Sequence, residues 1–236
     1  MDAAFLKKAA FFLKLFERQF SVRWDDAWPR GVDLHAAMRM NTAMDTKPSA
    51  THHVGSSRPL RLADDVVSHA VYGGRDKCYR YELTRTWDAD RPAVMWLMMN
   101  PSVATEDGDD RTVAKCQRYA RAWGYGTLLV GNTFAYRCTD QKRLTEVPDP
   151  VGPDNDRHLL EMARRADLVI AAYGSPQIKS LLPRGPEVVR MLQQHGITVS
   201  AMRLSRRSGR PEHPLYLPAD LRPDPLPAYP PAYLPA

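Results

Sequence analysis

An apolar run at residues 94–99 ends abruptly in Asn100, Pro101 and Ser102, and a polar, acidic loop follows it. Pro101 disfavours helical dihedral angles for the preceding residue, so it holds Asn100 extended where the predicted strand ends. A carboxamide both donates and accepts hydrogen bonds, which makes Asn100 a candidate for binding a polar ligand. The other interpretation is that Asn100 only caps its own loop, as asparagine often does.

Polar or conformationally special residues also follow two further apolar runs. Asn132 and Phe134 come at the end of the run at 127–132, and Gly174 comes at the end of the run at 167–174. A strand does not need an amide or an aromatic ring in order to end. We therefore interpret these residues as candidate ligand-binding positions.

The segment after a fourth apolar run, at 197–204, is rich in arginine and includes Arg206 and Arg207. Guanidinium groups bind phosphate well, so contact with a phosphate group is one interpretation of this segment. A solvated basic loop is the other. His213 stands out among the seven histidines because it lies in this basic segment beside a proline.

The acidic run around Asp109 and Asp110 invites a metal-binding interpretation. It lacks the spaced glutamate of an EF-hand loop, however, so we favour helix capping by one of these two residues. The three cysteines form no CxxC pair and no cluster with metal-ligand spacing. We therefore predict no metal site, no cofactor and no disulfide framework, which fits a reducing, cytoplasmic environment.

Strand-like apolar segments alternate with amphipathic helical segments along most of the chain. This alternation predicts an α/β fold, a three-layer sandwich with a mainly parallel central sheet covered on both faces. The two-residue alternation at 79–87, followed by a turn at 88–92, predicts an antiparallel edge hairpin with the strand at 93–99. We expect the four core strands at 93–99, 127–132, 167–174 and 197–204, and helices at 113–123, 154–166 and 186–194.

These elements determine where the polar residues lie. Right-handed crossovers return the chain in the same direction, so the carboxyl ends of parallel strands share one edge of the sheet. Open α/β sheets bind ligands in the crevice outside that edge. A helix beginning after Asp110 points its N-terminal amide groups toward the same crevice, where they favour an anion. We therefore expect Asn100, Asn132 and His213 to share one site.

The 236-residue chain is long enough for one sizeable domain, which we place at 62–217. An amphipathic helix or extension at 1–40 and a flexible linker at 41–61 precede this domain, and a proline-rich tail at 218–236 follows it. No apolar run reaches the roughly 18 residues that a transmembrane helix needs. The formal net charge of +6 and the pI of about 9.3 are compatible with nucleic acid or a nucleotide as partner, and equally with no anionic partner.

Four blocks of the sequence resemble a bacterial family known only as domain of unknown function 1643. The blocks are "MMNPSVATEDGDDRTVAKCQRYARAWGYG", "GNTFAYRCTD", "DPVGPDND" and "GRPEHPLYLP", and the likeness covers residues 78–217. This resemblance implies no particular activity.

A second resemblance is to the uracil-DNA glycosylase superfamily, in which an Asn-Pro or Asp-Pro turn follows a core strand and a His-Pro segment follows the last strand. Here "MMNPS" is similar to the first motif and "EHPLYL" to the second. The resemblance implies that Asn100 holds a water molecule against the anomeric carbon and that His213 stabilises negative charge on the departing base. It also implies that Phe134 stacks on a flipped base and that Leu215 or Tyr216 wedges into the duplex.

Two positions depart from the superfamily's pattern. Met99 replaces the glycine that precedes the amide or acid of the first motif, and Leu215 replaces the serine that follows His-Pro. Asparagine positions water but cannot act as a general base, so Asp109 or Asp110 would have to take that role.

The leading prediction is an α/β protein that binds a nucleobase, a nucleotide or nucleic acid, with glycosylase-like hydrolysis of an N-glycosidic bond as its activity. One alternative is a non-catalytic module that binds nucleic acid or a phosphorylated ligand. The other is a hydrolase or transferase that acts on a small metabolite.

Overall fold

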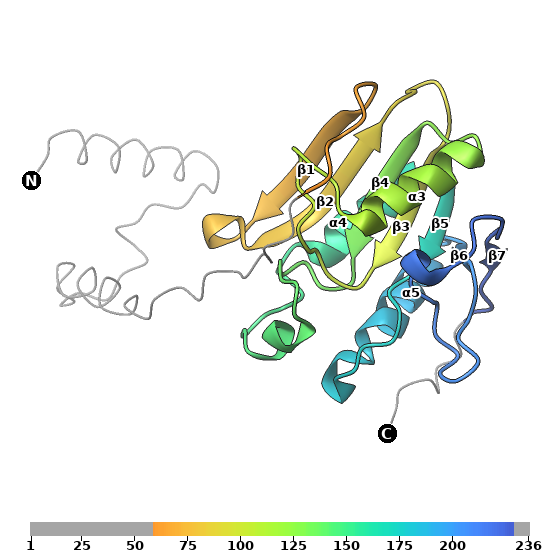
Figure 1. Cartoon of the computed structure of the whole chain (residues 1–236). Coiled ribbons are helices and arrows are strands. Elements are labelled where there is room, and N and C mark those ends of the chain that lie inside the picture. Colours follow the sequence, from red (N-terminus) through yellow and green to blue (C-terminus); the bar gives the residue numbers. More distant parts are fainter. Residues whose placement is uncertain (1–58, 229–236) are drawn as a thin grey trace, which may run out of the picture. The chain divides into compact units, whose positions relative to one another are not determined.

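The structure, a computed structural model, describes residues 59–228. The predicted extension at 1–40 lies outside the described residues, as do most of the linker and the end of the tail. The described chain forms a mixed α/β domain with three helices and one seven-stranded sheet (Figure 1). The strands are β1 (Val67–Gly73), β2 (Tyr79–Thr86), β3 (Ala93–Met98), β4 (Thr127–Asn132), β5 (Leu168–Ala171), β6 (Val199–Ala201) and β7 (Asp224–Pro225), and the helices are α3 (Arg111–Ala122), α4 (Asn155–Arg165) and α5 (Arg184–Gln194).

The centre of the sheet is parallel, as the sequence predicts. In the order β1-β2-β4-β3-β5-β6-β7, strand β3 runs parallel to β4 and to β5, and β6 continues the parallel set. Strand β5 is shorter than the predicted run at 167–174, because the chain leaves the sheet and turns at Gly174, whose φ is 69°. Glycine adopts this left-handed conformation without steric cost.

Helices cover both faces of the parallel strands and make three layers. Alternate residues of a strand point to opposite faces. Val94 and Trp96 of β3 pack with α3 in one core cluster, whereas Met95 and Leu97 pack with α4 and α5 in another. Such burial on both faces requires the continuous apolar runs seen in the sequence. Within residues 59–228, no helix combines the length and apolar character needed to cross a membrane.

The predicted hairpin between β2 and β3 is wrong. The turn at 88–92 does reverse the chain, but β4 lies between these two strands and pairs with both, antiparallel to β2 and parallel to β3. The antiparallel hairpin at this edge is formed by β1 and β2 instead. The sequence does not predict strand β1, because its side chains are mostly half-exposed and it has no apolar run.

A β-bulge interrupts β2 near its start. Val71 pairs with Glu82 but the next residue, Tyr72, pairs with Arg80, so Tyr81 is an extra residue in β2. Such an insertion reverses the face to which the flanking side chains point. The result is that Arg80 points to the α3 side of the sheet, where it hydrogen-bonds Asn132, whereas Glu82 points to the α4 side.

Helix α3 begins and ends where the sequence predicts. The Asp110 side chain caps its N-terminus by accepting a hydrogen bond from the Val113 N–H at 2.8 Å, and Gly124 follows its end with φ of 87°. Tyr119 of α3 stacks on Trp96 at 5.7 Å between ring centroids, and an aromatic pair of this kind contributes about 0.5–1.5 kcal/mol beyond burial. This packing fixes the helix, and with it the position of its first turn.

The segment after β6 is tied to α3. A short 3-10 helix, η5 (Pro214–Tyr216), packs against α3, where Lys115 donates hydrogen bonds to the carbonyl oxygens of Leu215 and Leu217. The Tyr119 hydroxyl donates to the Leu217 carbonyl oxygen at 3.1 Å. These contacts place the residue before η5, His213, beside the first turn of α3.

Candidate functional site

The carboxyl ends of β3 and β4 meet the first turn of α3 at a small pocket, which we call the amide pocket. Its volume is about 180 Å³. Five residues singled out in the sequence line it, and they come from four separate segments of the chain. They are Asn100, Ser102, Asp110, Asn132 and His213.

The two carboxamides reach the same pocket because of strand register. Met98, at the end of β3, lies opposite Asn132, at the end of β4. Val130 and Met98 both point into the core beneath α3. Every second residue shares a face of the sheet, so Asn100 and Asn132 both follow on the α3 side.

Asn100 presents an acceptor to the pocket. Its amide nitrogen donates to the carbonyl oxygen of Cys138 at 2.7 Å and to that of Pro101 at 3.2 Å. These two contacts occupy both amide hydrogens and orient the side chain, because carbonyl oxygens can only accept. Asn100 thus ties its own loop together, and Oδ1 makes no hydrogen bond within residues 59–228. That oxygen remains as the group able to accept from a ligand or a water molecule.

Asn132 presents the opposite polarity. Its Oδ1 accepts a hydrogen bond from Arg80 Nη2 at 3.3 Å. A guanidinium has no acceptor, so this contact fixes which end of the amide faces Arg80 and leaves the NH₂ group for a ligand. Asn155 donates to the backbone carbonyl oxygen of Asn132 at 2.9 Å and so holds the end of β4 in place. An acceptor and a donor carboxamide therefore line one pocket.

Arg80 lies under Asn132 and also lines the pocket, although no sequence motif marks it. Its side chain is 2% exposed, and its other hydrogen bond goes to the carbonyl oxygen of Ala104. Among residues 59–228, no carboxylate lies within ion-pairing distance, and Arg80 Nε has no partner. Burial lowers the pKa of Arg80 to about 10, which the charge of Asp110 partly opposes. The floor of the pocket thus carries a positive charge without a paired anion.

His213 lines the other side of the pocket. Its Nδ1 accepts a hydrogen bond from the Leu215 N–H at 3.3 Å, so the neutral ring carries its proton on Nε2. Burial lowers the pKa of His213, against the opposing charge of Asp110. The imidazole is therefore neutral at pH 7 and offers an N–H donor.

The two aspartates considered as a general base have different surroundings. Asp110 lines the amide pocket, and only its Oδ1 is used in capping α3. Asp109 is buried and forms an ion pair with Arg85 at 2.9 Å, and it also accepts a hydrogen bond from Gln117. Asp110 therefore keeps a carboxylate oxygen for chemistry, whereas Asp109 holds the fold together.

A second pocket, of about 370 Å³, adjoins the amide pocket. Gly174 lines it together with Tyr216 and Glu212, and His213 lines both pockets. It lies outside the ends of β5 and β6. The structure thus places Gly174 next to the amide pocket and not within it.

The remaining candidates lie elsewhere. Pro101 is buried in the loop, and Phe134 is 4% exposed in a separate apolar cluster, so neither faces the two pockets. Arg206 and Arg207 are exposed in a turn and line neither pocket. Leu215 lines a different groove, beside α3.

Two of the three cysteines are buried. Cys138 lines the amide pocket beside Asn100 but is 0% exposed, and burial raises its pKa to about 12. Burial also raises the pKa of Cys116 well above its ordinary value. Neither thiol carries the thiolate that nucleophilic attack requires at neutral pH.

One group of possible metal ligands, Glu82, His158 and Glu161, lies on the α4 side of the sheet. Glu82 already binds His158 Nδ1 at 2.6 Å and Arg165 at 2.5 Å. Both of its oxygens are thus engaged with cationic or N–H partners. This arrangement favours a structural polar network over a metal centre.

Comparison with known proteins adds one result. No curated protein and no solved structure matches the chain significantly. The profile of the family described as "Protein of unknown function (DUF1643)" matches residues 80–215, more than half of the chain, and this range includes every residue of the amide pocket. The chain therefore belongs to the DUF1643 family.

Proposed function

We propose that the amide pocket binds a nucleobase and that the protein hydrolyses the N-glycosidic bond of a bound nucleotide unit. One observation carries this proposal: an acceptor amide, a donor amide, a neutral imidazole and a carboxylate from four segments converge on one pocket. The edge of a nucleobase alternates hydrogen-bond donors and acceptors, and adjacent groups of opposite polarity suit it.

The size of the pocket supports a base as the bound group. A volume of about 180 Å³ is close to the roughly 150 Å³ of an engineered protein cavity that binds one benzene ring. That space suits a single ring and is too small for a base with its sugar and phosphate. The rest of the ligand would lie outside the pocket.

The chemistry of the groups suits hydrolysis. The bond between the anomeric carbon and the base nitrogen breaks, and its electron pair leaves with the base. The Nε2–H of His213 donates to the charge that develops on the base. The second carboxylate oxygen of Asp110 orients the attacking water, whose oxygen bonds to the anomeric carbon, and accepts the released proton.

The fold supports the same proposal. The Asn-Pro-Ser turn follows β3, the His-Pro segment follows β6, and both lie at one edge of a parallel sheet. These positions are the ones expected from a likeness to the uracil-DNA glycosylase superfamily. A glycosylase-like fold is thus part of the proposal.

Arg80 favours a second candidate, a non-catalytic module that binds a phosphate group. A buried guanidinium without a carboxylate partner is well placed to bind an anion supplied by a ligand. The two candidates share the amide pocket but differ in the bound group, a nucleobase or a phosphate, and in turnover.

Release of free base from DNA that contains deaminated or alkylated bases tests the proposal. We expect His213→Ala to lower release roughly 100- to 1,000-fold, the usual loss of one donor to a developing anion. His195→Ala, at an exposed position after α5, is the matched control and should leave release unchanged. Circular dichroism and thermal melting would show that both variants fold.

The outcomes separate the two candidates. Base release that depends on Asn100 and His213 supports the glycosylase. Ligand binding that Asn100→Ala weakens, with no base released from any substrate, supports the binding module. If Asn100→Ala affects neither binding nor release, the amide pocket is not the functional site.

A further inference from the structure

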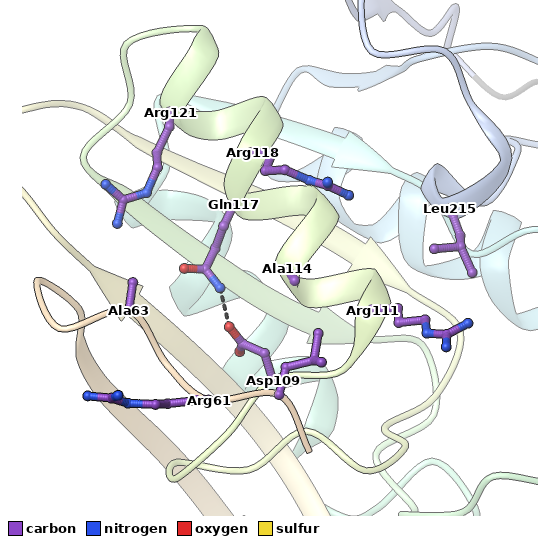
Figure 2. A pocket seen from close by; sticks show the side chains of 10 residues that line it. Arg61, Ala63, Asp109, Arg111, Ala114, Gln117, Arg118, Arg121 and Leu215 are labelled. Atoms are coloured by element: carbon purple, nitrogen blue, oxygen red, sulfur yellow. Dashed lines mark hydrogen bonds between the residues drawn. The ribbon is translucent and has the colours of Figure 1, made fainter. Parts of the chain in front are cut away.

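A larger hollow, of about 430 Å³, lies along α3 and is lined by residues on both sides of that helix (Figure 2). We call it the arginine groove. Four arginines line it, three of them on α3 and one on the segment before β1. They are Arg61, Arg111, Arg118 and Arg121.

Within the described part of the chain, two of these arginines lack a counter-ion. Arg121 pairs with Asp65 at 2.9 Å, and Arg61 pairs with Asp64 at 2.6 Å. Arg111 and Arg118 make no hydrogen bond and no ion pair within residues 59–228. Helix α3 itself contains no acidic residue, so these two positive charges stay unbalanced on its surface.

Arg111 and Arg118 share one side of the helix. Figure 2 shows both pointing from α3 toward the side on which Leu215 lies, whereas Arg121 points the other way. Seven residues separate the two arginines, which corresponds to about 10.5 Å along the helix axis. Lys115 lies between them and binds the backbone of η5. The two charges therefore flank the point where η5 packs on α3.

The groove and the amide pocket are lined by residues of the same two segments, the first turn of α3 and residues 213–215. Arg111 begins α3, and the next two residues, Thr112 and Val113, line the amide pocket. Likewise Leu215 lines the groove, while His213, two residues earlier, lines the pocket. A ligand bound at Arg111 thus lies close to the mouth of the pocket.

A base in the amide pocket leaves its sugar and phosphate outside, and these need a surface of suitable charge. The adjoining pocket beside Gly174 offers little positive charge, because the charge of Arg203 near it is taken by Glu212 at 2.6 Å. The arginine groove offers two unpaired guanidinium groups. The spacing between Arg111 and Arg118 also allows each arginine to bind a different phosphate. A strand of nucleic acid has several phosphates in a row, whereas a nucleoside monophosphate has one.

We propose that the arginine groove binds the phosphate backbone of a nucleic-acid strand whose base enters the amide pocket. This inference rests on the proposed function and narrows its substrate to nucleic acid, as opposed to a free nucleotide. It assigns the backbone contact to Arg111 and Arg118 and not to Arg206 and Arg207.

Fluorescence anisotropy of a labelled strand of roughly 15 nucleotides, single or in duplex, tests this assignment with the full chain. We expect the Arg111→Ala, Arg118→Ala double variant to bind at least roughly tenfold more weakly. The slope of log affinity against log salt should fall by about 1.4 to 1.8, which corresponds to two lost phosphate contacts.

The matched control is the double variant Arg157→Ala, Arg164→Ala on α4. It removes the same charge at the same seven-residue spacing from a helix on the other face of the sheet. We expect its affinity and salt slope to equal those of the wild type. Equal losses in both double variants, or a loss found only with Arg206→Ala and Arg207→Ala, would overturn the assignment.

The same measurements separate this inference from the proposed function. Strand binding that depends on Arg111 and Arg118 supports the groove whether or not any base is released. Base release from free nucleosides, with no strand binding at low salt, would overturn the groove and leave the glycosylase standing.

An Asn132→Ala variant should keep the wild-type salt slope, because Asn132 touches the base and not the phosphate. A reduced slope would overturn the division between pocket and groove.

Discussion

Arg80 and Arg85 lie in the same strand, β2, and both are buried, but their surroundings differ. Arg85 is 0% exposed and binds Asp109 through two nitrogens, each at 2.9 Å from the carboxylate. Its remaining N–H groups donate to Ser68 and to backbone carbonyl oxygens nearby. Arg80 is almost equally buried, but within residues 59–228 its only partners are a backbone carbonyl oxygen and the Asn132 amide.

The difference separates structural charge from functional charge. A buried ion pair with every N–H satisfied stabilises the fold when intact and offers nothing to a ligand. A buried cation without an anion keeps its attraction for one, and it lies where a pocket opens. Arg85 thus belongs to the framework behind α3, and Arg80 belongs to the amide pocket.

The largest expected effect is on stability, at Arg85. We expect Arg85→Met to lower the free energy of unfolding by about 3–5 kcal/mol, because it leaves the Asp109 carboxylate buried without its cation. Urea denaturation at pH 7 measures this difference.

A double-mutant cycle sharpens the result. Adding Asp109→Asn to Arg85→Met removes both charges and should recover part of the lost stability. If the loss of stability in the double variant equals the sum of the losses in the single variants, the two charges do not interact. Arg85 would then not be a structural charge paired with Asp109.

The same substitution at Arg80 should have a smaller effect on stability. Arg80→Met leaves the Ala104 carbonyl oxygen without a partner, but it also removes a desolvated charge that no carboxylate balances. These effects oppose each other, so we expect a net loss of about 1 kcal/mol. Ligand binding should suffer most, and the rise in melting temperature that a bound ligand gives the wild type should be lost. A loss as large as that of Arg85→Met would show that Arg80 is structural.

Much of the fold and part of the site could be predicted from the sequence. The continuous apolar runs revealed the parallel strands, because strands buried on both faces cannot alternate. The shared direction of those strands brought Asn100, Asn132 and His213 to one edge, which is a consequence of topology and needs no atomic detail. Asp110 was recognisable as a helix cap from its residue type and place alone.

Arg80 could not be predicted, because its position depends on a bulge. A strict two-residue alternation puts Arg80 on the same face as Glu82. The extra residue at Tyr81 reverses the alternation and turns Arg80 toward the α3 side. Phe134 was misplaced for a related reason: its burial depends on the packing of the long loop after β4, which leaves no periodic pattern in the sequence.

The smallest expected effect is the pH dependence of stability that His213 causes. His213 lines the same pocket as Arg80 but is neutral. Burial lowers its pKa in the folded chain below the ordinary value of about 6.5 that it has when unfolded. As the pH falls, the imidazole therefore becomes protonated in the unfolded chain at a higher pH than in the folded chain. In the folded chain, protonation of Nδ1 breaks the hydrogen bond that this atom accepts from the Leu215 N–H. The stability that His213 contributes is present above pH 6.5 and is lost as the pH falls below that value.

A pair of denaturation series from pH 8 to pH 5 checks this sign. The free energy of unfolding of the wild type, minus that of His213→Gln, should decrease as the pH falls, since glutamine does not titrate and other groups cancel. An increase would mean that the charge of Asp110 outweighs burial and holds the imidazole protonated. His213 would then be a cation beside Arg80, and the amide pocket would be built for an anion from both sides.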